Sequence, residues 1–583
     1  MKSLYISIIA LFCVGISGQA QHAEKIDTTV DRTLILEREY NPTVNDAFKI
    51  NELPGLKEPE ATKAEIEFSN FSVPYQIKPQ IPTLLANAYF TDMKYSAKKG
   101  YLNAGLSTLM DITGELGYQL LNDKTNELNI WATHRSSNSK VKYLQSDEKQ
   151  KMKINDNKIG IAYINSGPVL KVFTDVDYTY SGYNYYGYSL PSLSSHFETA
   201  DKGVNQVDQI INANAGLLSS KSPDELNYLF KINYSHFGKK YAPDKSIAGP
   251  KENYFQLDMG LSKGLGSDML IGFNGYFRSS TYSLDKDNAN LQYEGYESFS
   301  DLGLNPYIKF EGTNWSAKLG LLLDLLFNHE KNANIAPDIV LHYRPSENFL
   351  LYLNAGGGVA DNSAKSIYRE NRYISPLFRV QDAYSPFDGT LGFKVPLGNF
   401  WMDIFTGYKY TRQEHFYLPG RLSYEYENII GANFAEPIYR DEEVFRLGAN
   451  LKYEYGDLID CGIKVVYNGR SIRNKNKDQE DKTYYDYAWN KPVFEGDAVL
   501  GIKVPDFPLR FDLMYHLGTG RKSLNKETKI KDINELNIEG LYAINNSFSL
   551  VAKVNNLLNQ KYDLWYGYPA QGICFTGGVN IKF

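Results

Sequence analysis

The sequence predicts an all-β fold: a transmembrane antiparallel β-barrel of about 22 strands, preceded by a short extended N-terminal segment. Two observations predict it: apolar and polar residues alternate over long segments, and short turns alternate with long connections. The composition agrees, since the 583 residues include 46 Tyr and 30 Phe, and tyrosine favours strands with one apolar and one wet side. The mean hydropathy of −0.41 excludes a bundle of apolar membrane helices but permits a barrel, in which only alternate residues face lipid.

The first hundred residues divide into two segments. After a basic second residue comes the apolar stretch LYISIIALFCVGISG, and Gly18 and Ala20 fit the small-x-small pattern of a cleavage site. Residues 1–20 are therefore predicted to be a signal peptide, which implies export. Residues 21–99 are polar and contain several prolines, so we expect an extended segment that stays in the periplasm or enters the barrel lumen. Residues 100–583 are predicted to form the barrel, located in the cell outer membrane.

Period-two alternation is clearest in four segments. LRFDLMYHL at 509–517 and LKVFTDVDYTY at 170–180 each place apolar side chains on one face and polar ones on the other, as a strand requires. Residues 226–236 and 548–555 repeat the pattern. Charged residues in the middle of such strands indicate a wet lumen. The predicted lumen residues include Asp175, Asp177, Arg510, Asp512 and Lys553.

The connections between the segments are of two kinds. Short turns rich in Gly, Pro, Asn and Asp, such as NSGP at 165–168 and INNS at 544–547, alternate with long connections. In outer-membrane barrels the turns are periplasmic and the long loops lie outside. The long connections are predicted at 184–204, 281–298, 358–383, 411–440 and 470–487.

Two of the predicted outer loops are unusually aromatic. Tyrosine gives a large contact area at low entropic cost, so these side chains are candidate contacts for a sugar or a protein ligand. The alternative is that they sit at the membrane interface or pack loop against loop, which needs no ligand. The candidate residues are Tyr183, Tyr185, Tyr186 and Tyr188 in the first loop, and Phe416, Tyr417, Tyr424 and Tyr426 in the second.

The C-terminal stretch GICFTGGVNIKF also alternates. Its apolar face is predicted to contact lipid, and an alternating last strand that ends in Phe is typical of clients of the barrel-assembly machinery. The residues predicted to form this C-terminal assembly signal are Phe575, Val579, Ile581 and Phe583.

Several function classes are disfavoured by the sequence. The net charge of −6 is small for this length, so nucleic acid is not an expected partner. After signal cleavage only Cys461 and Cys574 remain, and we expect them on separate strands rather than in a disulfide. No CxxC or HExxH motif is present, and none of the eight His lies in a catalytic motif. We therefore expect no catalytic, metal or cofactor site, and the protein is not expected to be an enzyme.

The approach to the last strand carries a family resemblance. VNNLLNQKYDLWYGYPAQG at 554–572 resembles the corresponding stretch of TonB-dependent receptors, and the tyrosine-rich loops look like those of Bacteroidota. The matching residues are Asn556, Leu557, Leu558, Asn559, Lys561, Tyr562, Gly567, Tyr568, Pro569 and Gly572. The family usually has Arg after the final glycine, where this chain has Ile573.

The resemblance implies transport across the outer membrane, or a role as the barrel subunit of an outer-membrane complex. The family places a globular plug domain before its barrel. Only residues 21–99 stand in that place here, so we expect the plug to be lacking. Two alternatives remain open: a passive porin-like channel, and a structural or assembly component that binds surface lipoproteins. The expected partners are outer-membrane lipid, the barrel-assembly machinery and a lipoprotein or periplasmic protein.

Overall fold

A computed structural model places most of the chain from residue 98 onward, and the chain divides into the compact units Met1–Ile81 and Pro82–Phe583. Only the second unit contains described residues. These are 98–123, 125–188, 205–219, 221–222, 224–242, 248–283, 298–327, 333–376, 378, 380–421, 430–473, 488–522 and 530–583.

The described residues form 24 strands and one short helix. The barrel strands are β1 (Gly100–Ser107), β2 (Ile112–Asn122), β3 (Asn126–Lys142), β4 (Lys149–Ser166), β5 (Leu170–Asn184), β6 (Asn205–Ser219), β7 (Asn227–Lys239), β8 (Lys251–Gly264), β9 (Met269–Ser283), β10 (Phe299–Glu311), β11 (Trp315–Phe327), β12 (Ala333–Ser346), β13 (Phe349–Ala360), β14 (Ala383–Leu397), β15 (Phe400–Arg421), β16 (Ile430–Tyr455), β17 (Ile459–Arg473), β18 (Phe494–Lys503), β19 (Leu509–Thr519), β20 (Ile533–Ala543), β21 (Phe548–Asn555) and β24 (Cys574–Lys582). The helix is α3 (Ala364–Glu370), and β22 (Asp563–Trp565) pairs with β23 (Tyr568–Pro569).

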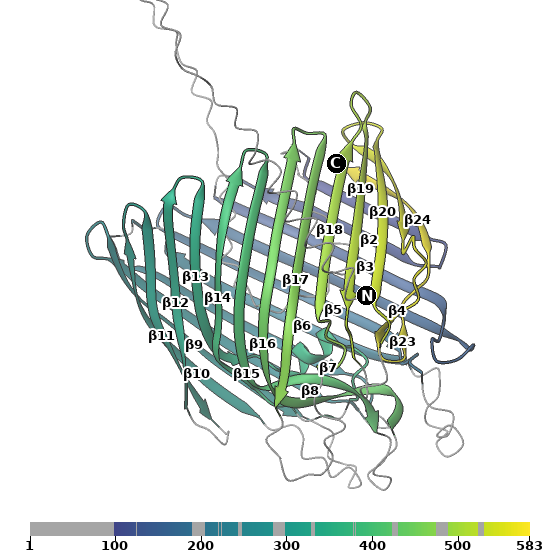
Figure 1. The fold of residues 1–583 in the computed structure, drawn as a ribbon, viewed down its shortest axis with the longest axis horizontal. Helices are drawn as coiled ribbons and strands as arrows, with labels where there is room; N and C mark the ends of the chain where they lie inside the picture. Colours follow the sequence, from purple (N-terminus) through teal and green to yellow (C-terminus); the bar gives the residue numbers. More distant parts are fainter. Residues whose placement is uncertain are drawn as a thin grey trace, which may run out of the picture. The chain divides into compact units, whose positions relative to one another are not determined.

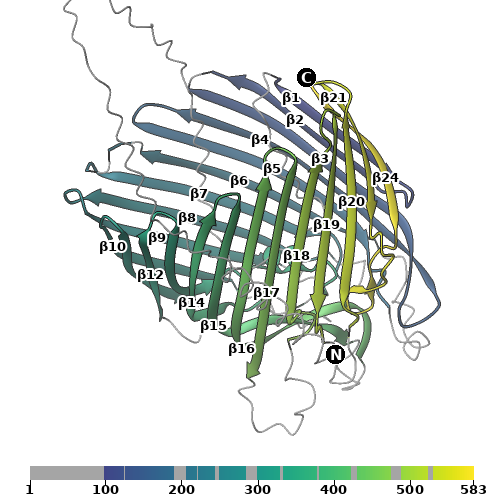
Figure 2. The same ribbon diagram turned by 45° about the horizontal axis from the view of Figure 1, so that its top comes forward.

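The predicted 22-stranded antiparallel barrel is confirmed. Each strand pairs with its neighbours along the chain, and β1 pairs with both β2 and β24, so the sheet closes on itself (Figures 1 and 2). A closed sheet leaves no strand edge unpaired. No helix in the described part of the chain is long and apolar enough to cross a membrane.

The two faces of the wall differ as the alternation predicts. On β4 and β5 the outer face exposes Ile159, Ile161 and Val176, which suits contact with lipid. The inner face carries Asp177, which accepts a hydrogen bond from Asn212 at 3.0 Å. The other predicted lumen residues also take inner-face positions and are paired: Asp175 with Asn214, Arg510 with Asp512 and Asp460, and Lys553 with Glu539.

Short turns gather on one rim of the barrel and long connections on the other. We call these the turn rim and the loop rim; the start of β1 and the end of β24 lie on the turn rim. One prediction here is wrong. Residues 411–440 are largely strand, because β15 runs to Arg421 and β16 starts at Ile430. Above the membrane no lipid contacts the outer face of the strands, so that face need not be apolar. The alternation of apolar and polar residues that predicts a strand is therefore weak in this segment.

The seam that closes the barrel brings the C-terminal Phe583 close to Gly100 at the start of β1. The ring of Phe583 stacks on Tyr118 at 6.0 Å between centroids, and the backbone N–H of Phe583 donates to the carbonyl of Gly100 at 2.9 Å. A Cβ at position 100 would lie 2.6 Å from Phe583 Cε2, so any larger residue there would require the rings of Phe583 and Tyr118 to shift. Cys461 and Cys574 are both free, which confirms the prediction for this pair.

Candidate functional site across the barrel mouth

The helix α3 belongs to a connection that folds inward at the loop rim. Ser363 caps the helix, since its side chain accepts a hydrogen bond from the Ser366 N–H at 3.3 Å. The Lys365 N–H donates to Glu252 on β8 at 2.8 Å. The helix ends at Asn371, whose N–H donates to the Ile367 carbonyl at 3.0 Å. We call residues 363–376 the crossing segment.

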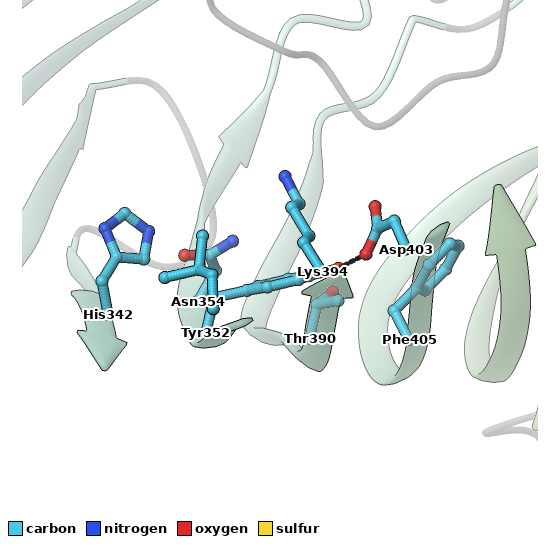
Figure 3. A pocket seen from close by; sticks show the side chains of 8 residues that line it. His342, Tyr352, Asn354, Thr390, Lys394, Asp403 and Phe405 are labelled. Atoms are coloured by element: carbon cyan, nitrogen blue, oxygen red, sulfur yellow. Dashed lines mark hydrogen bonds between the residues drawn. The ribbon is translucent and has the colours of Figure 1, made fainter. Parts of the chain in front are cut away.

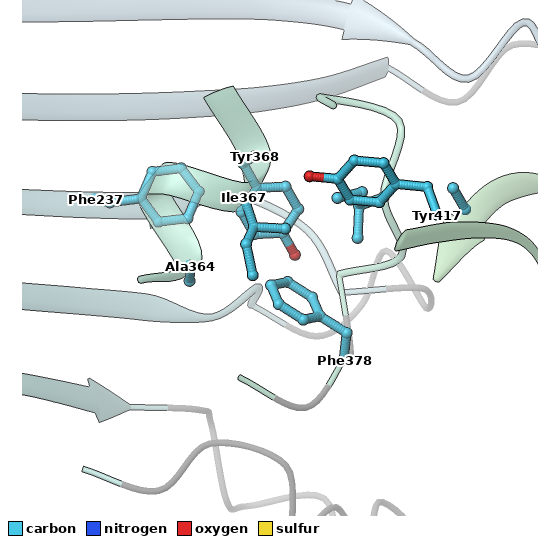
Figure 4. Close-up of a cluster of buried hydrophobic side chains, with 8 residues drawn as sticks. Phe237, Ala364, Ile367, Tyr368, Phe378 and Tyr417 are labelled. Atoms are coloured by element: carbon cyan, nitrogen blue, oxygen red, sulfur yellow. The ribbon is translucent and has the colours of Figure 1, made fainter. Parts of the chain in front are cut away.

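A hydrophobic cluster fixes the crossing segment to the wall. Ile367 and Tyr368 of α3 are buried together with Phe237 of β7, Tyr417 of β15, and Phe378 of the connection before β14 (Figure 4). Rings of Phe237 and Tyr368 stack at 5.2 Å between centroids. Since a fully buried large apolar side chain contributes about 2 kcal/mol, this cluster alone holds the segment firmly in place.

A buried lysine adds a polar anchor beneath the helix. The ammonium group of Lys239 on β7 lies 3.0 Å from Asp208 and 2.5 Å from the hydroxyl of Tyr183. It also lies 4.1 Å from the centre of the Tyr368 ring, a favourable position for a cation. Asp208 therefore offsets part of the cost of burying this charge, and the helix adds the face of the Tyr368 ring.

Two polar contacts tie the crossing segment to β4 and to the extension of β15. Arg372 donates two hydrogen bonds of 3.0 Å to Asp156 on β4. Glu370 accepts a hydrogen bond of 2.6 Å from His415 on β15. The strands β4 and β15 lie half-way round the 22-stranded ring from each other, whereas Arg372 and Glu370 are only two residues apart. The β15–β16 hairpin therefore extends over the mouth to meet the segment, and Asn433 of β16 donates a hydrogen bond of 2.8 Å to the Tyr185 carbonyl.

These contacts shift the pKa values of the two charged residues of the crossing segment. Burial opposes the charge on Arg372, but the Asp156 carboxylate outweighs it and raises the pKa of Arg372. Burial would raise the pKa of Glu370, yet the hydrogen bond and the charge of His415 lower it. Both groups are therefore held in their charged forms at neutral pH.

The far end of the segment joins an extension of the barrel wall. Ile374 pairs in parallel with Ala435 of β16. The Ser375 N–H donates to the Ala435 carbonyl at 2.8 Å, and the Ala435 N–H donates to the Tyr373 carbonyl at 2.9 Å. The segment thus adds a short strand edge to the hairpin of β15 and β16, and backbone pairing reinforces the ion pairs.

The predicted aromatic residues of the first loop meet at this segment. Tyr183, Tyr185 and Tyr186 are all buried. The Tyr183 hydroxyl donates to the Arg372 carbonyl at 2.8 Å, and the Tyr185 hydroxyl donates to the Ile374 carbonyl at 3.1 Å. The half-buried Tyr188 packs edge-on against Tyr143.

The aromatic residues of the second loop are also enclosed. Phe416 is fully buried and packs edge-on against Trp489 at 5.8 Å. Tyr417 packs edge-on against Trp565 at 5.0 Å. Tyr424 and Tyr426 lie outside the described residues. The described aromatics therefore build the loop cluster, and their role as ligand contacts stays a prediction.

Arg521 links two further connections to this cluster. Its guanidinium donates to the carbonyl of Asp563 at 2.7 Å and to that of Leu564 at 2.6 Å. Burial lowers the pKa of Arg521 to about 10 and raises the pKa of Asp563. The loop that carries Tyr568 is thereby fixed to the neighbouring connection.

A second inner-wall feature lies on β12 to β15 below the mouth. It is an open cavity of about 260 Å³. Tyr352 donates a hydrogen bond of 2.8 Å to Asp403, and the Lys394 ammonium lies 5.0 Å from the centre of the Tyr352 ring (Figure 3). The sequence predicts none of these residues as a site, although alternation places each of them on the inner face. His342, Asn354 and Thr390 complete this polar lining.

The predicted C-terminal signal residues take the lipid-facing side of β24. Phe575 and Phe583 are exposed, and Val579 and Ile581 are partly exposed. Val579 pairs with Ala104 and Leu550 of the adjoining strands. Their recognition by the assembly machinery stays a prediction.

Together these features define the class of protein: a closed, membrane-spanning β-barrel with an apolar belt and a polar inner wall. Barrels of this construction lie in the outer membrane, and the chain is an outer-membrane protein. No protein-family model matches the sequence. No curated protein sequence matches it either.

Solved structures of an iron transporter and of two receptors share this fold. The FrpB iron transporter of Neisseria meningitidis aligns with a TM-score of 0.63 at 11% identity, covering 84% of this chain and 82% of FrpB. A variant of the ferric enterobactin receptor PfeA of Pseudomonas aeruginosa, in complex with enterobactin, gives 0.60 at 11% identity with the same coverage. The siderophore receptor PirA of Acinetobacter baumannii gives 0.59 at 9% identity, covering 85% of this chain and 81% of PirA. At these identities the likeness is one of fold.

Proposed function

We propose that this protein is a receptor-type transport barrel of the outer membrane, whose mouth is held closed by its own crossing segment until cargo or a partner displaces it. The observation that carries the proposal is the chain of contacts from Asp156 on β4, through Arg372 and Glu370, to His415 on the extension of β15 over the mouth. A passive pore has no need of a segment that joins the connections over its mouth to one another.

The structural neighbours support receptor-like transport in general, since their names include an iron transporter and siderophore receptors. The resemblance at residues 554–572 to TonB-dependent receptors points the same way. In this proposal the barrel lacks the globular plug domain that the family places before its barrel. The proposal assigns no energy-coupling step to the protein. It leaves the chemical identity of the cargo open.

Planar-bilayer conductance tests the proposal. The full-length protein should be silent, because the crossing segment and the loop cluster obstruct the lumen. A variant with residues 364–376 replaced by a short Gly-Ser linker should give large, steady openings. The matched control inserts the same linker into the turn at 544–547, away from the mouth, and should stay silent.

Two results would favour the other candidate functions. A large steady conductance of the unmodified protein would identify a passive porin-like channel. A silent barrel that co-purifies from native membranes with a stoichiometric lipoprotein, and whose deletion leaves growth on every tested nutrient unchanged, would identify a structural or assembly component.

A further inference from the structure

A buried carboxylate holds the start of the crossing segment. Glu252 of β8 is 1% exposed, and one of its oxygens accepts a hydrogen bond of 2.8 Å from the Lys365 N–H. Its other oxygen accepts hydrogen bonds from the hydroxyls of Ser280 at 3.3 Å and Tyr282 at 3.4 Å. In the register of the wall, Glu252 stands between Phe237 of β7 and Tyr282 of β9. This contact therefore docks α3 on the inner wall.

Glu252 stands above the lipid-facing belt. Its neighbours Lys251 and Asn253 lie on the outer face and are polar, and the exposed apolar residue that follows them on that face is Phe255. Because successive side chains of a strand alternate between its two faces, Glu252 points inward at the loop rim. Water that enters the mouth when the segment lifts would reach this carboxylate.

The surroundings of Glu252 favour its protonated form. Burial raises the pKa of Glu252 to about 7, and the Asp361 carboxylate adds to this rise, whereas the Lys365 N–H and the Lys365 charge oppose it. The Lys365 ammonium group lies 5.0 Å from the centre of the Tyr254 ring. On β9 the Tyr282 hydroxyl stays neutral, because burial raises its pKa. A carboxyl group with a pKa near 7 changes its charge in the neutral range.

The other groups around this contact leave the direction of the effect unchanged. On β7 the facing Phe237 is uncharged, and Lys239 two positions further along pairs with Asp208 at 3.0 Å. Asp382, in the connection that leads to β14, also has a pKa raised to about 7, mainly by burial. Asp382 therefore responds to pH in the same sense as Glu252.

The raised pKa of Glu252 links the closed state to a proton. Lifting the segment would return this carboxyl group to water and its pKa to the ordinary value of 4.5. Between pH 4.5 and about 7 the closed state then keeps a proton that the open state has lost. The contribution to closure is complete below the ordinary pKa, and it is lost as the pH rises to the raised value.

We infer that the contact between Glu252 and α3 is a pH-sensitive latch, which holds the crossing segment while this carboxyl group keeps its proton and releases it more readily once the proton is lost. Cargo or a partner would then displace the segment more easily in neutral or alkaline medium than in acidic medium. The inference rests on the proposed closure of the mouth by this segment, and it adds the condition under which the closure weakens.

Thiol labelling of the full-length protein tests the latch. Ile374 of the crossing segment is fully buried, so Ile374→Cys, in a background with Cys461→Ser and Cys574→Ser, reacts only when the segment lifts. Its labelling rate is divided by that of the exposed variant Ser222→Cys at the same pH, because only the thiolate reacts. For pKa values of 4.5 in the open and about 7 in the closed state, this ratio should rise on the order of 50-fold between pH 5 and pH 8.

Glu252→Gln should remove most of this rise. The amide keeps an oxygen for the Lys365 N–H and carries no charge, like the protonated carboxyl group, so the variant should label at pH 8 as slowly as the parent protein does at pH 5. Any smaller rise that remains should disappear when Asp382→Asn is added. Asp361→Asn should make the rise smaller and complete it at a lower pH, because this substitution removes a charge that raises the pKa of Glu252.

A matched control changes a carboxylate away from the latch. Glu443→Gln breaks an ion pair with Arg473 and should leave the pH dependence of the labelling ratio unchanged. Heat-modifiable migration in electrophoresis checks that each variant folds. A ratio that stays constant or falls between pH 5 and pH 8 would overturn the inference, and so would a full rise in folded Glu252→Gln. If Glu252→Gln does not fold, an unchanged rise in Asp361→Asn overturns it.

The latch and the proposed function fail in different experiments. If the labelling ratio rises as expected but the Gly-Ser linker variant stays silent in planar bilayers, the latch stands and the proposed transport function is refuted. If the linker variant conducts and the labelling ratio does not depend on pH, the transport proposal stands and the latch is refuted.

Discussion

Replacing Arg372 by Met should loosen the crossing segment without unfolding the barrel. The substitution removes two charge-assisted hydrogen bonds to Asp156. Such bonds contribute about 1.5–3 kcal/mol each when buried, but the two side chains are 31% and 25% exposed, so solvent screening reduces the total to about 2 kcal/mol. Asp156 keeps its hydrogen bond from Ser181 and is not left unpaired. A loss of about 2 kcal/mol corresponds to a roughly 30-fold larger open population.

Thiol labelling at Ile374 measures that population directly. Ile374 is fully buried near the far end of the crossing segment, so Ile374→Cys reacts only when the segment lifts. The measurement uses a background with Cys461→Ser and Cys574→Ser. The labelling rate should rise about 30-fold with Arg372→Met, because a loss of about 2 kcal/mol increases the open population by that factor.

The control and the refuting result come from matched variants. Arg473→Met breaks a more exposed ion pair with Glu443, away from the segment, and should leave the labelling rate unchanged. Combining Arg372→Met with Asp156→Asn should add little to either single change, because both remove the same interaction. If the effects of the two substitutions on the labelling rate are fully additive, or if Arg372→Met leaves the rate unchanged, the ion pair between Arg372 and Asp156 does not hold the segment in place.

Three further outcomes are expected. Because the pKa of Glu370 is lowered in the folded protein, its contribution is complete above the ordinary Glu pKa and is lost as pH falls through the lowered value. The labelling rate at the buried position, divided by that of an exposed cysteine at the same pH because only the thiolate reacts, should therefore rise below about pH 4, and Glu370→Gln should flatten that dependence. Gly100→Ala should destabilise the closing seam by about 1–3 kcal/mol, measured by urea unfolding of the heat-modifiable band, whereas Gly577→Ala, with open space around it, should change little. Arg521→Met leaves buried carbonyls without a donor and should raise protease cleavage at the loop rim, and an unchanged digestion pattern would contradict this account.

The barrel wall was predictable because lipid and lumen impose opposite chemistry on alternate residues. Residues 509–517 and 170–180 show this directly, and both became strands with the expected faces. Charged mid-strand residues such as Asp512 identified the inner face for the same reason. The strand count followed from the alternation of segments and turns.

The crossing segment was not predictable by this means. Residues 363–376 show neither period two nor a long helical stripe, and α3 is stabilised by contacts that are distant in sequence, such as Glu252 with the Lys365 N–H. The same limit applies to Tyr183 and Phe416. Tyrosine and phenylalanine in a loop suit an exposed contact and a buried cluster equally well, and only the fold brings Arg372 and Ile374 to them.

The contact between Gly100 and Phe583 sets the order in which the barrel is completed. It joins the first and last strands of the ring, so almost the whole barrel must be made before it forms. Closing a loop of that length costs about 5 kcal/mol in chain entropy, which is recovered only when β1 and β24 pair along their full register. Until then both strands are open edges that attract other chains. Assembly therefore proceeds through an unclosed sheet, and the interval before closure is when the chain is most exposed to aggregation.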